Sequence, residues 1–126
     1  MRGSKGKKSP GVVALASGAT LQVIVDTTGL RGGGSQAVHA SLRFLTSHEH
    51  MGIVRLECVF KCSCVPLRLD AHRNYGLQRN MSIFEAVDFN ITGESQECTL
   101  QLRVLPETSS GQHKFKVNQI VLSPRR

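Results

Sequence analysis

Apolar and polar residues alternate with a period of two along most of the chain. The segment 38–47, VHASLRFLTS, sets polar His39, Ser41 and Arg43 between apolar neighbours, which is typical of a strand with one buried face. Similar alternation occurs in LQVIVD (21–26), GIVRLECVF (52–60), PLRLD (66–70), MSIFEAVDFNI (81–91), ECTLQLRVL (97–105) and HKFKVNQIVL (113–122). Turn-rich stretches such as TGES and PETSSGQ separate these segments, and no amphipathic helix pattern appears. The pattern predicts an all-β fold, an antiparallel, jelly-roll-like β-sandwich of about seven to eight strands.

The last predicted strand changes phase in its middle. Its inward positions are Phe115 and Val117 before Asn118, and Ile120 and Leu122 after it. One extra residue in a strand shifts the alternation in this way without ending the pairing. The sequence therefore predicts a long final strand that contains a β-bulge.

The length of 126 residues suits one domain. Residues 1–11, MRGSKGKKSPG, contain almost no apolar residue and are expected to form a disordered basic tail or linker. The β-sandwich domain is then expected over 12–123, with a short basic tail at 124–126. The longest uncharged apolar run is shorter than a bilayer span, so no membrane insertion is expected.

The net charge of +7 comes largely from the two ends of the chain. Six of the 16 basic residues lie there: Arg2, Lys5, Lys7, Lys8, Arg125 and Arg126. Solvated tails are the simpler interpretation, and a nucleic-acid-binding module that uses the basic tails is the alternative. The run VVALA follows a basic start, so a poor signal peptide is one open interpretation. Another is that Met1 is an artificial start and the chain is a piece of a longer protein.

The four cysteines, Cys58, Cys62, Cys64 and Cys98, allow three disulfide connectivities, among which the sequence does not choose. Cys58 and Cys98 occupy inward strand positions that facing sheets could bring together, so a Cys58–Cys98 bridge is the first expectation. The second is Cys64–Cys98 together with Cys58–Cys62. A Cys62–Cys64 bridge, across one intervening residue, would be strained.

Three other uses of these cysteines stay open. Zinc would need four ligands, with Cys98 or His72 completing the cluster, but a lone mid-strand Cys98 does not fit the paired spacing of structural zinc sites. A redox centre favours C-x-x-C at a helix start, whereas Cys62 and Cys64 form C-x-C. Free buried thiols in a cytosolic protein are the third. We favour disulfides and expect neither a metal nor a cofactor.

Two sequons support an oxidising, extracytoplasmic setting. Asn80-Met81-Ser82 and Asn90-Ile91-Thr92 both match the N-x-[ST] glycosylation pattern. Together with the cysteines, Asn80 and Asn90 predict a glycoprotein of the secretory pathway or the extracellular space.

No catalytic motif is visible. The chain lacks a G-x-S-x-G elbow, a phosphate-cradling glycine loop and an H-E-x-x-H helix. A catalytic triad could be written from Asp70, His72 and Ser82, but no motif in the sequence indicates that these three side chains lie together. We therefore expect a protein without enzymatic activity; the competing hypothesis is that the chain itself hydrolyses an ester.

The best polar cluster is SHEHMG, residues 47–52, in which His48, Glu49 and His50 lie between two predicted strands. It could bind a sugar hydroxyl or a metal, although a solvated hairpin is the plainer interpretation. Sugar binding by sandwich domains uses an exposed aromatic ring. The chain has no Trp, and four of its five phenylalanines are in phase with inward positions: Phe44, Phe60, Phe89 and Phe115. Tyr75 therefore completes the predicted ligand-binding set.

Several phrases resemble a known group of proteins. They are Glu49-His50-Met51-Gly52, the C-x3-C-x-C cluster with a later Cys, and ETSSG (107–111) leading to HKFKV (113–117). Over residues 18–123 the chain resembles the C-terminal β-sandwich region of plant and green-algal proteins whose preceding part looks like an SGNH (GDSL-type) hydrolase.

The resemblance implies an accessory domain in a secretory or Golgi-directed protein. Esterase chemistry would lie in the hydrolase part, and its Gly-Asp-Ser block and Asp-x-x-His pair have no counterpart in this chain. The expected function is a non-catalytic module that contacts a glycan or the neighbouring hydrolase domain through polar loops. The alternative is a part of an SGNH-type esterase, acting on cell-wall or glycan esters, without its catalytic portion.

Overall fold

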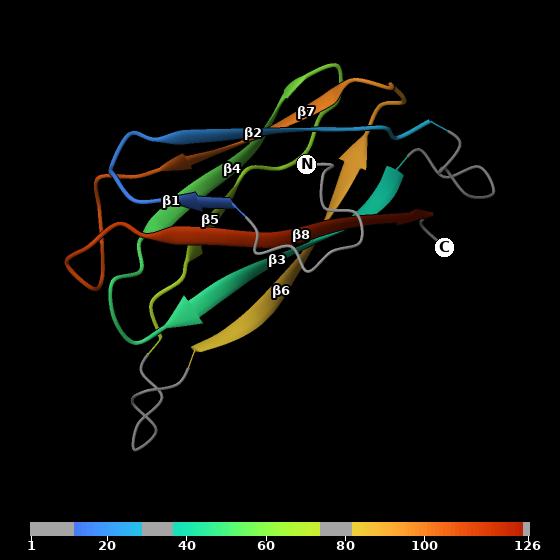
Figure 1. The fold of residues 1–126 in the computed structure, drawn as a ribbon. Helices are drawn as coiled ribbons and strands as arrows, with labels where there is room; N and C mark the ends of the chain where they lie inside the picture. The colour runs from blue at the N-terminus through green and yellow to red at the C-terminus, as the bar shows by residue number, and fades with distance from the viewer. Residues whose placement is uncertain (1–11, 29–36, 74–81, 125–126) are drawn as a thin grey trace.

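Eight strands form two antiparallel four-stranded sheets that pack face to face (Figure 1). The computed structural model describes residues 12–28, 37–73 and 82–124. The strands are β1 (Val12–Ala14), β2 (Thr20–Val25), β3 (Ala37–Ser47), β4 (Ile53–Phe60), β5 (Leu67–Asp70), β6 (Ser82–Thr92), β7 (Cys98–Val104) and β8 (Phe115–Pro124). The predicted all-β sandwich is confirmed, and β1 is a strand that the alternation pattern did not indicate.

The strand order is that of a jelly roll. Sheet A has the order β1-β8-β3-β6 and sheet B has the order β2-β7-β4-β5. The first strand thus pairs with the eighth, the second with the seventh, the third with the sixth and the fourth with the fifth. This is the pattern of one long hairpin rolled into a sandwich. Every connection except β4–β5 crosses from one sheet to the other.

The loops alternate between the two ends of the sandwich, because successive strands run in opposite directions. One end, called the histidine end below, holds the β1–β2, β3–β4, β5–β6 and β7–β8 loops. The other, called the disulfide end, holds the β2–β3, β4–β5 and β6–β7 loops.

The core lies between the sheets and consists of the inward positions of the alternating strands. In β3 they are Ala40, Leu42 and Phe44, and in β7 they include Leu100 and Leu102, all buried. The Phe44 ring stacks on that of Phe115 in β8, with centroids 5.4 Å apart. Burial of these side chains is the main force that holds the sheets together.

The predicted bulge in β8 is present. Arg43 pairs with Gln119, whereas the next residue, Phe44, pairs with Val117, so Asn118 is the extra residue. The shift keeps both halves of β8 in register with β3.

A second bulge, in β4, makes one prediction wrong. Cys58 pairs with Leu100 and Phe60 pairs with Thr99, so Val59 is the extra residue. The bulge turns Phe60 to the outer face of sheet B, where its side chain is 51% exposed. The Lys61 ammonium lies 5.2 Å from the ring centroid. Phe60 is therefore a surface residue, whereas Phe44, Phe89 and Phe115 are buried as expected.

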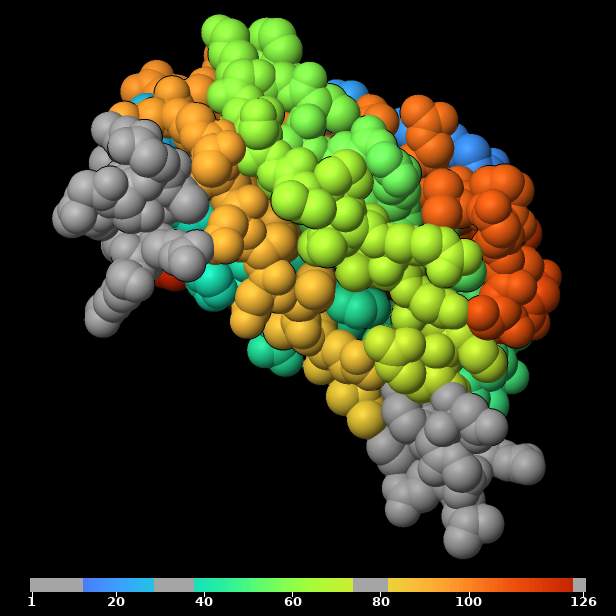
Figure 2. All heavy atoms as spheres, turned by 180° about the vertical axis from the view of Figure 1, so that it is seen from behind, coloured from blue at the N-terminus to red at the C-terminus, as the bar shows by residue number. Residues whose placement is uncertain are grey.

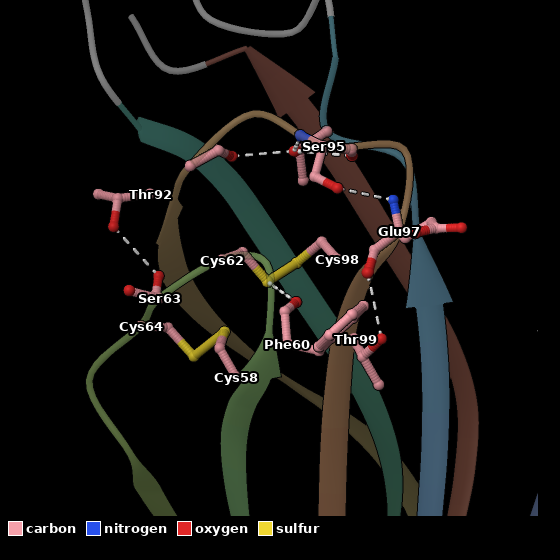
Figure 3. Close-up of a disulfide and its surroundings, with 12 residues drawn as sticks. Cys58, Phe60, Cys62, Ser63, Cys64, Thr92, Ser95, Glu97, Cys98 and Thr99 are labelled. Atoms are coloured by element: carbon pink, nitrogen blue, oxygen red, sulfur yellow. Dashed lines mark hydrogen bonds between the residues drawn. A yellow bond between two sulfur atoms is a disulfide. The ribbon is translucent and has the colours of Figure 1, made fainter.

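The four cysteines form two disulfides, but in neither of the expected pairings (Figure 3). Cys58 bonds to Cys64, and Cys62 bonds to Cys98. The expected Cys58–Cys98 bridge assumed facing sheets, whereas β4 and β7 are neighbours in the same sheet. The chain instead reverses after β4, with Lys61 in the left-handed region at φ 61°, so that Cys64 returns to Cys58 and Cys62 reaches Cys98.

The β4–β5 loop also contacts sheet A. Ser63 and Thr92 exchange two backbone hydrogen bonds of 2.8 Å, which join the loop to the end of β6. Gly93 follows with φ 105°, and a Cβ atom added there would lie 3.2 Å from Cys62 Cα. Figure 2 shows the β4–β5 segment, in green, running beside β6, in orange. The loop that carries the disulfides thus closes this side of the sandwich.

The third loop of the disulfide end is anchored by Thr27. Its fully buried hydroxyl accepts a hydrogen bond from the Ser95 amide at 2.9 Å and donates one to the Gly93 carbonyl at 2.9 Å. Beside it, hydrogen bonds from the Thr28 hydroxyl and amide hold the pKa of the exposed Asp26 carboxyl below its usual value. The described start of the β2–β3 loop is therefore fastened to the β6–β7 loop, just as the β4–β5 loop is fastened to the end of β6.

The two disulfides are expected to contribute unequally to stability. The Cys62–Cys98 bridge spans 36 residues and the Cys58–Cys64 bridge spans 6. Because a longer closed loop restricts the unfolded chain more, replacing Cys62 and Cys98 by serine should cost about 4 kcal/mol of unfolding free energy, and replacing Cys58 and Cys64 about 2 kcal/mol. Urea unfolding of the two double variants measures both values; equal losses, or the reverse order, would contradict the assignment.

Candidate functional site

Four of the five histidines of the chain gather at the histidine end. His48 and His50 lie in the β3–β4 loop, His72 follows β5, and His113 precedes β8. The fifth, His39, lies on β3. The clustering follows from the topology, because the loops that carry these residues all turn at the same end.

The β3–β4 and β7–β8 loops cross at Gly52. Its amide donates to the Lys114 carbonyl at 2.7 Å, and the Lys114 amide donates to the His50 carbonyl at 2.8 Å. On the other side, the Ala71 amide donates to the Gly52 carbonyl at 3.1 Å. A Cβ atom at Gly52 would lie 2.7 Å from His113 Cα, so only glycine allows the two backbones to approach this closely.

Glu49 lies between two imidazole rings. Its carboxylate oxygens are 3.9 Å from His48 Nε2 and 3.8 Å from His50 Nε2. His50 has φ 73°, and its Nδ1 contacts Gln112 Oε1 across the loop crossing. The side chains of Glu49 and His50 are 58% and 56% exposed. Glu49 and His50 are thus exposed, with the half-buried His48 beside them, and Gln112 is an addition that only the crossing of the loops reveals.

Serine hydroxyls brace the β7–β8 loop. Ser110 Oγ donates to the Met51 carbonyl, and Ser109 Oγ donates to Asp70 Oδ2, both at 2.6 Å. The loop is therefore fixed to the β3–β4 loop and to the end of β5, and it holds Gln112 in place beside His50.

An ion pair joins the two sheets on the β5–β6 side of this end. Arg73 Nε and Nη2 bond to the two carboxylate oxygens of Glu85 at 3.0 Å each, and Nη1 donates to the Asp70 carbonyl at 2.6 Å. The Thr46 hydroxyl also donates to Glu85, at 3.1 Å. Because a bidentate guanidinium–carboxylate pair fixes both partners in orientation, it positions the segment that carries His72.

Asp70, His72 and Ser82 reach the same end but do not form a relay among the described residues. Asp70 Oδ1 accepts the His72 backbone amide at 2.9 Å rather than its ring. The Ser82 hydroxyl donates to Ser47 Oγ at 3.3 Å. The atoms of a catalytic triad are therefore not connected here.

Two imidazole nitrogens are buried without a partner. His48 Nδ1 and His72 Nδ1 have no hydrogen bond within the described part of the chain. No group of three or more His, Cys, Asp or Glu side chains that could hold a metal lies in residues 12–28, 37–73 and 82–124. The cysteine sulfurs, which the zinc alternative required, are joined in disulfides.

The remaining predicted site residues are distributed differently. Tyr75 and Asn80 lie outside the described residues. Asn90 is exposed on β6. Among the described aromatic residues, Phe60, which was expected to point inward, is 51% exposed, and Phe84 is 36% exposed. The β4 bulge accounts for Phe60, and no feature of the sequence marks it.

Comparisons with known proteins found no match among protein families, curated proteins or solved structures. The part of the chain that the structure describes contains no helix long and apolar enough to cross a membrane. The two disulfides are typical of proteins that fold in an oxidising compartment.

Replacing Gly52 by alanine should disrupt the loop crossing. The added methyl group meets the His113 backbone, so we expect a loss of about 1–3 kcal/mol in unfolding free energy and altered NMR signals of His50 and His113. Gly18→Ala is the control, because Gly18 has a positive φ of 87° but nothing within 4 Å of its Cβ position. A cost no larger than that of the control would show that the close approach is absent.

Proposed function

We propose that this protein is a non-catalytic contact module that binds a glycan through the loops of the histidine end. The supporting observation is the exposed group of Glu49, His50 and Gln112, held by two crossing loops on a disulfide-bonded sandwich. Loops positioned by a rigid scaffold are the usual place for binding residues.

The chemistry of this group suits sugar hydroxyls. A carboxylate, an imidazole and an amide offer both donors and acceptors on planar side chains, and a hydroxyl can use either. Since the loops are already hydrogen-bonded to one another, little conformational entropy would be lost on binding.

The setting we propose is the secretory pathway or the extracellular space, with this chain as an accessory part of an SGNH hydrolase-like protein. The disulfides and the exposed Asn90 in its sequon support the setting. The resemblance described above supports the hydrolase context. A neighbouring hydrolase domain is the second candidate ligand for the same surface.

A panel of immobilised neutral oligosaccharides tests the proposal. Binding by the unaltered protein should weaken about fivefold in Glu49→Ala and in His50→Ala, because each loses a hydrogen bond worth about 1 kcal/mol. His39→Ala is the matched control, since His39 lies on β3 and not at the histidine end. If no oligosaccharide is retained, or if His39→Ala weakens binding as much as the other two variants, the histidine end is not a glycan site.

A further inference from the structure

Three arginines form a row across sheet B. Arg55 on β4 pairs directly with Arg103 on β7 and with Arg68 on β5. On the far side of β7, Arg103 pairs with Thr20 of β2. The strands are adjacent in the order β7-β4-β5 (Figure 1), so the three backbone positions are about 4.8 Å apart from strand to strand.

All three side chains lie on the outer face of the sheet. Arg55 is flanked along β4 by Val54 and Leu56, which point into the core and are 1% and 0% exposed. Arg103 likewise lies between Leu102 and Val104, each 2% exposed. Arg68 on β5 precedes the buried Leu69. Because side chains alternate between the two faces of a strand, all three arginines point to solvent, and each of them is exposed.

The row is electrostatically unfavourable on its own. Like charges directly opposite on neighbouring strands destabilise a sheet. Among the described residues, one carboxylate pairs with the row, that of Glu57, which contacts Arg55 Nε. An excess of two positive charges therefore remains on three neighbouring strands, and an anionic ligand would remove this repulsion.

The rest of the outer face adds two further kinds of contact. The next row toward the disulfide end consists of Glu57, Gln101 and Gln22, and the two glutamine side chains share a hydrogen bond of 2.9 Å. The row beyond it is apolar, with Phe60 and Ile24 on either side of Thr99. Phe60 and Ile24 are 51% and 61% exposed. Cations, amides and an apolar aromatic surface thus follow one another at steps of about 7 Å.

We propose that this outer face binds an anionic polysaccharide, with its sulfate or carboxylate groups on the row Arg103, Arg55 and Arg68. Guanidinium groups bind such anions with two parallel hydrogen bonds. The amide row suits sugar hydroxyls, and the Phe60 ring suits the apolar face of a pyranose. A single-stranded nucleic acid would need several stacking rings, and this face offers one. The site is separate from the histidine end and does not depend on it.

Titration with dextran sulfate, with uncharged dextran of the same length as reference, tests the proposal. The protein should bind the sulfated polymer alone, and the affinity should fall as salt rises. Arg68→Gln and Arg103→Gln should each weaken binding about two- to fivefold, as expected for exposed charge pairs. Their melting temperatures should stay equal or rise, because the repulsion within the row decreases.

Three controls separate this site from other sources of binding. Arg43→Gln removes an exposed arginine from β3 in sheet A and should leave the affinity unchanged. Changing Lys5, Lys7 and Lys8 together to glutamine in the full chain should reduce the affinity for dextran sulfate less than Arg103→Gln does. Glu49→Ala should have no effect, so this proposal and the one for the histidine end can fail independently.

Several outcomes would overturn the proposal. They are no binding of dextran sulfate, equal losses in Arg43→Gln and Arg103→Gln, or a dominant effect of the lysine changes. Tighter binding of a thymidine homopolymer of equal charge would assign the face to nucleic acid instead.

Discussion

The fold depends on how the β4–β5 loop is tied to both sheets. The Cys62–Cys98 bond fixes the loop to β7, the Cys58–Cys64 bond fixes it to β4, and the Ser63–Thr92 hydrogen bonds fix it to β6. β4–β5 is the one connection that stays within its sheet. The disulfides fix this loop to sheet B, and the Ser63–Thr92 backbone hydrogen bonds then join it to sheet A. At the histidine end, the ion pair between Arg73, which follows β5, and Glu85 on β6 joins sheet B to sheet A.

The two binding sites that we propose lie on the loops and on an outer face of this sandwich. The interior between the sheets is a continuous cluster of apolar side chains. At the histidine end, loop crossings fix polar side chains that strand residues alone could not bring together. On sheet B the regular pairing of strands aligns residues into rows, which produces the alternation of cations, amides and apolar side chains on one surface.

The sequence was informative where a property depends on neighbouring residues only. Alternation predicted the strands and the sandwich, and the phase change near Asn118 predicted the bulge opposite Arg43. It also placed His48, Glu49 and His50 in a loop between strands. It failed where a property depends on which strands are neighbours. The disulfide pairing followed from β4 and β7 lying in one sheet, and the arginine row follows from register, whereas the sequence shows three isolated arginines. Phe60 was misplaced because a bulge at Val59 leaves no local signature.

Disulfide mapping tests the central constraint most directly. Trypsin should cleave the unreduced protein so that the cysteines fall on three peptides. Peptide 56–61 carries Cys58, peptide 62–68 carries both Cys62 and Cys64, and peptide 80–103 carries Cys98. Partial reduction followed by alkylation then identifies each bond by mass spectrometry. We expect all three peptides to be joined, with Cys62 bound to Cys98 and Cys64 bound to Cys58. A Cys58–Cys98 or Cys64–Cys98 bond, or four free thiols, would contradict it.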